Sequence, residues 1–486
     1  MPASAPAFRP DLSRADFTLL VVGAVIGADV YIVAAMGAAS LGPAQLVAWG
    51  FAGALAAVIA LAFVQCAAID SDVGGSYAYA QRAFGPLVGF LTGWALYAGE
   101  WIALPVFPLA FVSYLHRLLP GLPDAADIPA KLALVLAITG VNVFGARKGA
   151  RLNDVLAIAK LLPLGLLIVA AIALTVVHPH IASTHLQPFA PMGWSGFGSA
   201  VVPIFWAYAG FELAVLPAAE VRDPRRTLPQ GLVMGMAIAT GLYLLAAFAV
   251  VSGLPWQDAA ASSSPLASAM SAISTALGGP GTAAVVVMSV GAVVSIAGVY
   301  DAFTLGVSRL SYALAADGMF PSEFARLHPK YRTPHVGLGF QAVCAMVGST
   351  IFDLRGLITI AVFFLGLSYA VTGLAALRLV QRHPAQALHL PALRVLLVLA
   401  AAAGLYLATQ APVREITIGV AVMLLGLALY LARGARWRAV AVAVEKDESS
   451  AVAWAGHEYR WLMRGTHRLF RRSPPQRDGP AARQRS

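Results

Sequence analysis

Residues 17–40 read FTLLVVGAVIGADVYIVAAMGAAS, and residues 205–212 read FWAYAGFE. Each stretch belongs to an apolar block that is long enough to cross a hydrocarbon layer roughly 30 Å thick as a helix. Each also carries glycine where a membrane helix is expected to be regular, at Gly23 and Gly27 in the first block and at Gly210 in the second. We therefore expect two interrupted helices, and their spacing predicts the rest of the fold.

Apolar blocks dominate the whole chain. Of its 486 residues, 59% are hydrophobic and 12% are charged, against roughly 25% charged residues in an ordinary soluble domain. A soluble core cannot hide so much apolar surface. In lipid every backbone polar group must be paired, and long blocks without alternation suit helices rather than the strands of a membrane barrel. The sequence predicts an all-α polytopic membrane protein.

We expect twelve transmembrane helices. They lie near residues 17–40, 45–68, 86–115, 131–145, 152–177, 196–220, 231–252, 281–315, 337–352, 356–380, 391–410 and 413–432. The interrupted blocks are the first and the sixth, so each opens a unit of five helices. Because five is an odd number of crossings, the second unit enters the membrane upside down relative to the first, as in transporters built from inverted repeats.

This spacing divides the chain into five parts. They are a cytoplasmic N-terminus (1–16), a first five-helix repeat (17–180), a second repeat (181–380), helices 11 and 12 (381–432) and a basic cytoplasmic tail (433–486). Residues 460–472 could form a basic amphipathic helix on the anionic inner leaflet, or the tail is a solvated disordered segment. The N-terminus lacks the features of a cleaved signal peptide, so we expect none.

The formal charge of +10 follows the expected topology. Of the 33 Lys and Arg residues, twelve lie from residue 433 onward and fifteen lie in the N-terminus and alternate loops, whereas four lie in the opposite loops. This asymmetry is the positive-inside pattern, and it predicts a protein of the cell membrane with both termini in the cytoplasm. Nucleic-acid binding is not needed to explain the charge.

The interruptions have a chemical consequence. A broken helix leaves backbone N–H groups at the start of one half-helix and C=O groups at the end of the other, and these groups pair with a carboxylate or an ammonium. The alternative is that the glycines only allow close helix packing. The candidate substrate contacts in the breaks offer accessible backbone; they are Gly23, Ile26, Gly27, Ala28, Ala207, Ala209 and Gly210.

Four sets of motifs resemble the amino acid–polyamine–organocation (APC) superfamily of transporters. They are Gly23–Ala28; Gly74–Tyr79 with Gly89–Phe90 and Gly93–Trp94; Phe205–Glu212 with Asp223–Pro229; and Ser308–Arg309 with Ala316–Pro321 and Arg332–Pro334. The resemblance implies a LeuT-like fold, a 5+5 inverted repeat with two additional C-terminal helices. It also implies alternating access around a midplane site, for amino acids, polyamines or related amines that move with a cation or by exchange.

The same resemblance implies two aromatic residues at the site. Trp206 matches the gating tryptophan of arginine–agmatine exchangers, and its ring could attract an ammonium group by roughly 0.5–2 kcal/mol. Phe303, counted back from Asp317, falls where those exchangers place another aromatic ring. A core or lipid contact is the alternative for Trp206, and core packing is the alternative for Phe303.

Five ionisable residues lie within the expected spans: Asp29, Glu100, Lys160, Glu212 and Asp301. Each costs roughly 2.5–3.5 kcal/mol in lipid on insertion scales, so each is expected to face the bundle interior or water. Lys160 matches the helix 5 lysine of proton-coupled relatives, and a desolvated lysine can release and regain a proton. A fixed ammonium that braces the first break is the alternative.

Asp29 departs from the family pattern, which continues with glycine. A negative charge there favours an amine, a polyamine or another cationic substrate; pairing with Lys160 or a structural hydrogen bond is the alternative. Glu212 follows the helix 6 motif, where the resemblance implies proton sensing, and the alternative is that it satisfies N–H groups of the next half-helix. No role is carried over to Glu100, and Asp301 is either a pore residue or a polar bracket.

Together these features predict a secondary active transporter of amino acids or related amines, coupled to protons through Lys160 and Glu212. An exchanger without net proton coupling is the alternative, and a substrate-sensing receptor or a channel is the alternative from another class. An enzyme is not expected, because the spans lack a His-Glu-x-x-His motif, paired aspartates and a serine with a histidine partner.

The expected partners are the small-molecule substrate, protons and the lipid bilayer. No cofactor and no metal site are predicted. Cys66 and Cys344 lie within apolar blocks and are expected to be packing residues. His178, His180 and His185 are expected to lie in a solvated loop.

Overall fold

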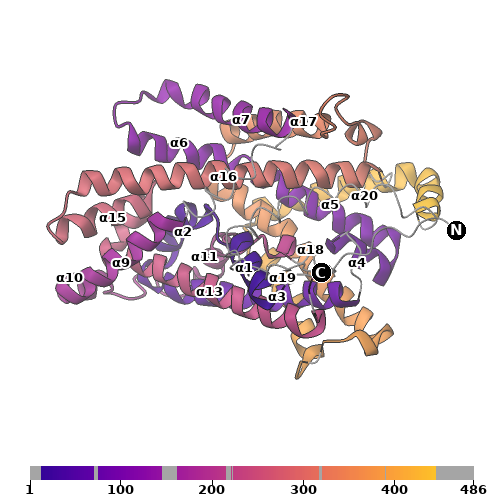
Figure 1. Ribbon diagram of the computed structural model, residues 1–486, viewed down its shortest axis with the longest axis horizontal. Helices are drawn as coiled ribbons and strands as arrows, with labels where there is room; N and C mark the ends of the chain where they lie inside the picture. The colour runs from indigo at the N-terminus through magenta and orange to yellow at the C-terminus, as the bar shows by residue number, and fades with distance from the viewer. Residues whose placement is uncertain are drawn as a thin grey trace, which may run out of the picture.

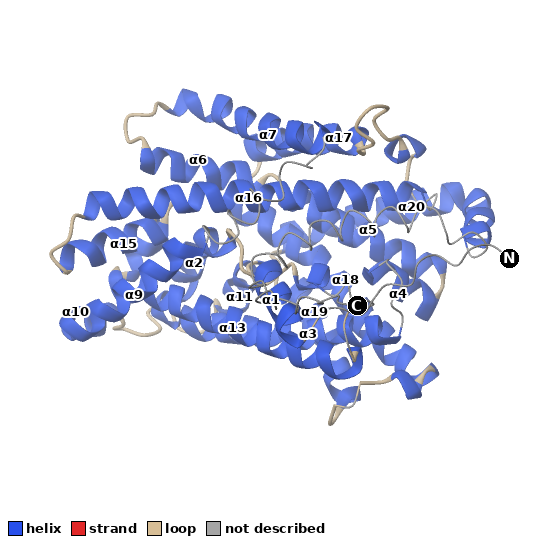
Figure 2. Ribbon diagram, viewed as in Figure 1, coloured by secondary structure: helices blue, strands red, loops and turns tan. Residues whose placement is uncertain are grey.

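The computed structural model is a bundle of α-helices, many of which run along its long axis (Figure 1). It describes residues 13–69, 75–144, 161–214, 221, 223–316, 320–388 and 390–444. Within these ranges the chain forms α-helices and short 3-10 turns and no β-strand (Figure 2). The all-α prediction is confirmed for this part of the chain.

The helices follow the expected apolar blocks in order. Up to residue 185 they are α1 (Arg14–Val25), α2 (Asp29–Leu41), α3 (Gln45–Ile69), α4 (Gly75–Phe84), α5 (Pro86–Ala103), α6 (Val106–Leu118), α7 (Asp127–Phe144), α9 (Leu161–Val177) and α10 (Pro179–His185). In the rest of the chain they are α11 (Phe197–Trp206), α12 (Phe211–Ala214), α13 (Pro224–Gly253), α14 (Trp256–Ala261), α15 (Pro265–Ala276), α16 (Gly281–Ala316), α17 (His335–Ile351), α18 (Leu354–Arg382), α19 (Leu393–Thr409) and α20 (Val413–Val444).

Several of these segments can cross a membrane. Seven described segments are long and apolar enough: Asp29–Ile69, Pro86–Leu118, Asp124–Phe144, Arg226–Gly253, Gly281–Ala316, Leu354–Arg382 and Val413–Ala432. The pair α9 and α10 is bent by 108°, and α11, α17 and α19 are apolar but shorter. Each expected span overlaps a helix or two consecutive helices. The chain is polytopic, and the exact twelve-helix 5+5 arrangement stays a prediction.

Local sequence explains where two of the helices begin. Ser13 and Asp16 form a reciprocal cap at α1: Asp16 N–H donates to Ser13 Oγ at 3.3 Å, and Ser13 N–H donates to Asp16 Oδ2 at 3.0 Å. At α18, Gly356 N–H donates to the Asp353 carboxylate at 3.0 Å. Each cap satisfies a backbone donor that the first turn of a helix leaves without a partner.

Small residues let α18 and α19 approach closely. A Cβ added at Gly366 would lie 2.7 Å from the Gly404 carbonyl oxygen, and one added at Gly373 would lie 2.6 Å from the Ala401 backbone nitrogen. Membrane helices gain stability from such close backbone packing because lipid gives no hydrophobic driving force between them. In α18 and α19, glycine therefore allows close helix packing. This is the role that was considered as the alternative for the glycines of the interrupted spans.

The interrupted helices occupy the centre of the bundle. In Figure 1, α1 and α11 lie between the long helix α16 and the helix α13. α1 packs against α13, and α11 packs against α2 and α3. Cys66 and Cys344 form no disulfide, and Cys66 is buried in α3.

Candidate functional site

The first interruption lies at residues 26–28, between α1 and α2. Ile26 has an extended backbone (φ −75°, ψ 102°), and its N–H donates to the Val22 carbonyl, so α1 ends there. A Cβ added at Gly27 would lie 2.6 Å from Asp29 Oδ2, so glycine is what lets the Asp29 side chain fold back over the break. Asp29 is the first residue of α2, where the positive end of the helix dipole favours a carboxylate.

Gly23 lies beside this break rather than in it. It is a helical residue of α1, it is exposed, and a Cβ added to it would meet no other atom within 4 Å. The structure thus brings Ile26, Gly27 and Ala28 together in non-helical backbone and keeps Gly23 in the preceding turn.

The second interruption lies at residues 207–210, between α11 and α12. Ala207 and Ala209 lie in tight turns, in which their N–H groups donate to the carbonyls three residues earlier. Gly210 has φ +111°, a conformation that strongly favours glycine. A Cβ added to Gly210 would lie 2.5 Å from the Ala24 carbonyl oxygen. The two breaks therefore meet backbone to backbone.

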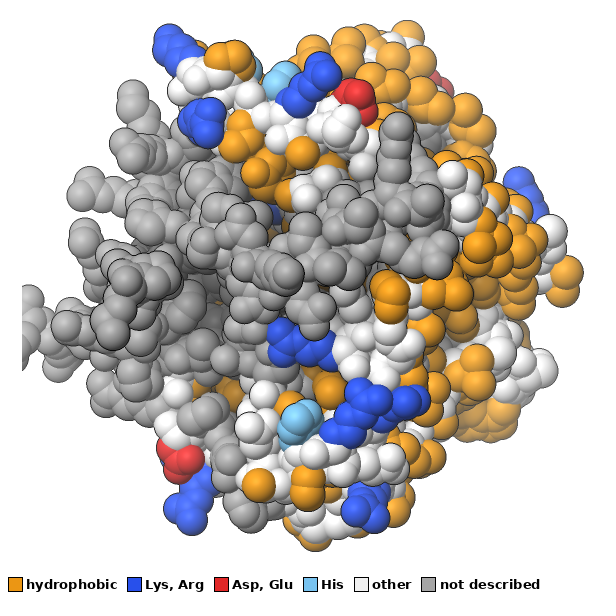
Figure 3. All heavy atoms as spheres, turned by 90° about the vertical axis from the view of Figure 1, so that its right-hand side faces the viewer, with side chains coloured by type: hydrophobic (Ala, Val, Ile, Leu, Met, Phe, Trp, Pro, Cys, Tyr) orange, Lys and Arg blue, Asp and Glu red, His pale blue; other side chains and the backbone are white. Residues whose placement is uncertain are grey.

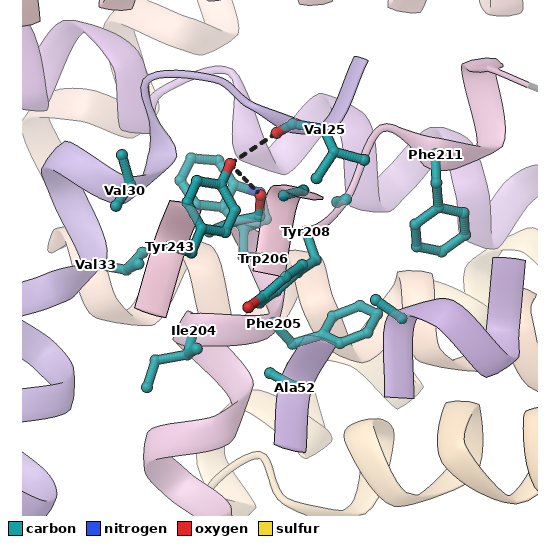
Figure 4. Packing of buried hydrophobic residues seen from close by; sticks show 14 of the residues in the cluster. Val25, Val30, Val33, Ala52, Ile204, Phe205, Trp206, Tyr208, Phe211 and Tyr243 are labelled. Carbon is teal, nitrogen blue, oxygen red and sulfur yellow. Dashed lines mark hydrogen bonds between the residues drawn. The ribbon is translucent and has the colours of Figure 1, made fainter. Parts of the chain in front are cut away.

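One side chain joins the two breaks. The Tyr243 hydroxyl, from α13, lies 2.8 Å from the Val25 carbonyl oxygen and 3.0 Å from the Ala207 carbonyl oxygen, and it accepts a longer hydrogen bond of 3.4 Å from Gly27 N–H (Figure 4). These backbone groups are among those that the interruptions release. The sequence analysis missed Tyr243, and no local signal distinguishes it from other tyrosines in apolar helices.

Aromatic rings cover one side of the breaks. Trp206 is the last residue of α11, is 1% exposed, and its indole N–H has no hydrogen-bond partner among the described residues. Phe107 lies between the two expected aromatic residues, with ring centroids 5.9 Å from Trp206 and 5.2 Å from Phe303. Phe107 was missed, although Pro105 next to it marks the place where α5 gives way to α6.

Three acidic residues, Asp29, Glu100 and Glu212, lie close to one another near the breaks. Asp29 is 5% exposed and Glu212 is 7% exposed. Glu212 Oε2 accepts a hydrogen bond from Gly210 N–H at 3.0 Å, and the carboxyl group of Glu100 lies close enough to Glu212 for the two acids to interact. Asp29 lies close enough to Glu100 for their charges to interact. In the described ranges, neither glutamate forms an ion pair with Lys or Arg.

Glu100 is partly exposed although it lies in the middle of the bundle, surrounded by neighbouring side chains. The sequence analysis named Glu100 and gave it no role, because only the tertiary structure shows that it lies near Glu212.

Two other ionisable residues of the expected spans stand apart from this group. Lys160 lies outside the described residues. Asp301 accepts a hydrogen bond of 2.7 Å from the Asn142 side chain, which links α16 to α7. This contact fits the polar bracket that was one of the two interpretations of Asp301.

The three histidines that were expected in a solvated loop lie at the short helix α10, which follows His178 and contains His180 and His185; Pro179 at its first position favours the start of a helix. A ring nitrogen of His185 lies 2.8 Å from the Ser252 carbonyl oxygen, and the rings of His178 and His180 are 6.0 Å apart. Within the part of the chain that the structure describes, no group of three or more His, Cys, Asp or Glu is arranged to hold a metal ion.

Comparison with known proteins gives a family match over most of the chain. A family model described as amino acid permease matches residues 12–430. The branched-chain amino acid permease BcaP of Bacillus subtilis is 27% identical over 71% of this chain and 75% of its own length. The methylthioribose transporter of the same organism is 27% identical over 77% of this chain and 82% of its own length. The human cationic amino acid transporter 4 is 27% identical over 77% of this chain and 61% of its own length.

Proposed function

This chain belongs to the amino acid permease family of the APC superfamily, and from that premise we propose that it is a secondary active transporter of an amino acid or a related amine. It works by alternating access in the cell membrane and couples transport to protons. As a member of this family the chain is a multi-pass membrane transporter rather than an enzyme.

The observation that carries the proposal is the contact between the two breaks. Gly210 lies against the Ala24 carbonyl, and the Tyr243 hydroxyl joins Val25 to Ala207. Non-helical backbone at membrane depth is tolerated where it lines a cavity or is buried in protein, and its free groups suit the charged ends of a small solute. The proposed substrate contacts are residues of the two breaks and of the helix turns beside them: Gly23, Ile26, Gly27, Ala28, Asp29, Ala207, Ala209 and Gly210.

The acidic and aromatic side chains favour a positively charged group on the substrate. Asp29, Glu100 and Glu212 supply negative charge, and Trp206 and Phe303, with Phe107 between their rings, supply aromatic faces for an ammonium or an aliphatic chain. The names of the relatives refer to branched-chain and cationic amino acids and to methylthioribose. Of these cargoes, a cationic amino acid or its amine suits the charges best.

Proton coupling is assigned to Lys160 and Glu212. Glu212 begins the half-helix after the second break, so a change in its charge acts directly on the break. An exchanger without net proton movement is the alternative, and a receptor or a channel is the alternative from another class. A receptor would bind the same solute without accumulating it in vesicles.

The charge on one end of the molecule supports the proposed orientation. Lys and Arg side chains gather over the end that faces the viewer in Figure 3, which includes the region of α4. The positive-inside rule makes this end cytoplasmic, and both termini are proposed to lie inside the cell.

Purified protein in liposomes with an imposed pH gradient tests this function. Labelled cationic amino acids and the corresponding decarboxylated amines should accumulate, and collapse of the gradient should stop accumulation. Uptake that ignores the gradient would contradict proton coupling and favour exchange. Loss of gradient-driven accumulation in Lys160→Ala, with counterflow retained, would support the role of Lys160; normal accumulation in this variant would contradict it.

A thermal-stabilisation screen identifies the substrate independently of transport. Only a ligand that binds the folded protein raises its apparent stability. We expect cationic amino acids or amines to raise the melting temperature more than neutral amino acids of the same size. The reverse order would contradict the assigned charge preference.

A further inference from the structure

We infer that Arg378 and Arg382, at the end of α18, form a binding site for the phosphate group of an anionic phospholipid in the surrounding bilayer. The site is built from α18 and α4, at the end of the molecule where Lys and Arg side chains gather (Figure 3). It goes beyond the proposed function and depends on it only for the leaflet, which is the cytoplasmic one.

The first observation is that one face of α18 changes from apolar to basic where the helix ends. Leu374, Arg378 and Arg382 are spaced four residues apart, so they lie on one face of α18 at successive turns. Leu374 is 48% exposed in a segment that is able to cross a membrane, and both arginines are exposed. The exposed leucine suits hydrocarbon, and the two guanidinium groups follow one and two turns later, at the level of the lipid headgroups.

The second observation is that contacts with α4 hold both guanidinium groups in place. The Arg378 guanidinium lies over the Phe84 ring, 5.2 Å from the ring centroid. Arg382 Nη1 donates a hydrogen bond of 2.9 Å to the Arg82 carbonyl oxygen, in the last turn of α4. Because both side chains are already positioned by the same turn of α4, they lose less conformational freedom on binding a ligand than two unattached arginines would.

The third observation is that most of the hydrogen-bond donors of this pair are left for a ligand. A guanidinium group has five N–H donors in a planar arrangement. The Phe84 ring is not a conventional acceptor for Arg378, and the Arg82 carbonyl engages one nitrogen of Arg382. Neither guanidinium group forms an ion pair with a carboxylate in the described part of the chain. Phosphate oxygens accept such paired, charged donors more strongly than neutral groups do.

The charge of the surrounding sequence selects an anionic lipid over a zwitterionic one. From Leu354 to Arg414 the chain contains no Asp or Glu, and α4 contains none either. The ammonium group of a zwitterionic headgroup would therefore meet two positive charges and no carboxylate on these elements. Phosphatidylglycerol carries the phosphate without an ammonium group, and basic clusters at the cytoplasmic surface attract anionic lipids in general.

Binding of the phosphate should also attach α4 more firmly to α18. Both guanidinium groups contact the last turn of α4, so a phosphate that is bound by both joins this turn to the end of α18. Only the folded protein presents the two arginines together. The lipid should therefore raise the apparent stability of the protein.

Native mass spectrometry of the purified protein, titrated with phosphatidylglycerol in detergent, tests the site directly. In the double variant Arg378→Gln, Arg382→Gln, the affinity for the first bound lipid should fall by about tenfold or more, because charged hydrogen bonds are lost. The matched control is Arg326→Gln, Lys330→Gln, which removes the same charge from exposed side chains of the segment before α17 and should leave the affinity nearly unchanged. Unchanged binding in the first variant, or an equal loss in both, would overturn the inference.

The wild-type protein separates the lipid from other sources of phosphate. Phosphatidylglycerol should raise the melting temperature more than phosphatidylcholine with the same acyl chains. Inorganic phosphate and glycerol 1-phosphate at equal concentration should not displace the bound lipid. Equal thermal shifts by the two lipids would overturn the preference for an anionic headgroup, and displacement by inorganic phosphate would overturn the lipid as the source of the phosphate.

A lysine variant keeps the test valid if the glutamine variant does not fold. Arg378→Lys, Arg382→Lys retains both charges and loses the planar paired donors, so it should bind phosphatidylglycerol more weakly than the wild type. Equal binding would overturn the role of the guanidinium groups. None of these measurements uses uptake of a solute. Lipid binding in a protein that transports nothing would refute the proposed function alone, and transport by a protein without this lipid site would refute the inference alone.

Discussion

The two breaks are built alike and carry different chemistry. Each ends an apolar half-helix and is followed by an acid in the first turn of the next one, Asp29 in α2 and Glu212 in α12. Asp29 folds back over its own break at Gly27. Glu212 instead accepts a hydrogen bond from the Gly210 N–H of its own break. The two acids thus act on their breaks in different ways: Asp29 covers the backbone at Gly27, and Glu212 binds a backbone N–H group.

This difference shows how two similar helix breaks can have two different roles. The first break offers a carboxylate beside free backbone, which suits contact with a cationic substrate. The second offers a carboxyl group that is hydrogen-bonded to the backbone of the break, which suits the proposed coupling because a change in its charge acts on the break. Tyr243 joins the breaks through Val25 and Ala207, so a change at either one reaches the other.

The largest effect is expected from Gly210→Ala. A non-glycine residue at this φ costs about 1–3 kcal/mol in backbone strain, and the new Cβ would meet the Ala24 carbonyl oxygen at 2.5 Å. We expect uptake in proteoliposomes to fall by more than tenfold. Gly165→Ala in α9 is the matched control, because it is exposed and a Cβ there meets no atom within 4 Å. Equal uptake by both variants would mean that the breaks do not touch as described.

Tyr243→Phe is expected to have the next largest effect. It removes the hydroxyl that serves both breaks and leaves the ring in place, which costs about 1–3 kcal/mol for buried backbone groups that lose their partner. Initial rates of uptake should give a kcat/KM lower by about tenfold or more, with a normal melting profile. Tyr208→Phe removes a hydroxyl that donates to the Trp49 carbonyl of α3, which belongs to neither break, so its effect should be smaller. If the Tyr208 variant is the more damaged, the bridge is not what couples the breaks.

Asp29→Asn sharpens the distinction between the two acids. Loss of the charge should weaken binding of amines relative to neutral amino acids by about tenfold, since a hydrogen bond to a charged group is worth about 1.5–3 kcal/mol. Competition of a set of unlabelled amines and amino acids for uptake gives this ratio. Asp258→Asn in exposed α14 should not change it. A constant ratio in the Asp29 variant would assign this acid to structure rather than to selectivity.

Trp206→Phe is expected to have the smallest effect. Phenylalanine is a weaker partner for a cation than tryptophan, so substrate affinity should fall by about two- to tenfold, measured as the ligand concentration that gives half of the full thermal shift. Trp194, which is 52% exposed, supplies the control variant Trp194→Phe. An unchanged affinity would mean that Trp206 packs in the core and does not bind the substrate.

The helical class and the place of both breaks followed from sequence because their causes are local. Apolar blocks of sufficient length predict helices in lipid, and Gly27 and Gly210 mark where the backbone departs from them. Gly23 shows the limit of that reasoning: it belongs to the same motif as Gly27, yet it lies inside α1. A glycine motif identifies a region of weak helix and does not determine which residue breaks it.

The sequence by itself determined a helical membrane protein with two interrupted spans, because hydrophobic length and glycine act within a few residues of chain. Only the tertiary structure decided that Tyr243 serves both breaks, that Phe107 lies between Trp206 and Phe303, and that Glu100 meets Glu212. These contacts join residues far apart in the chain. They depend on how helices rotate and pack against each other, which the local pattern of a single sequence does not specify.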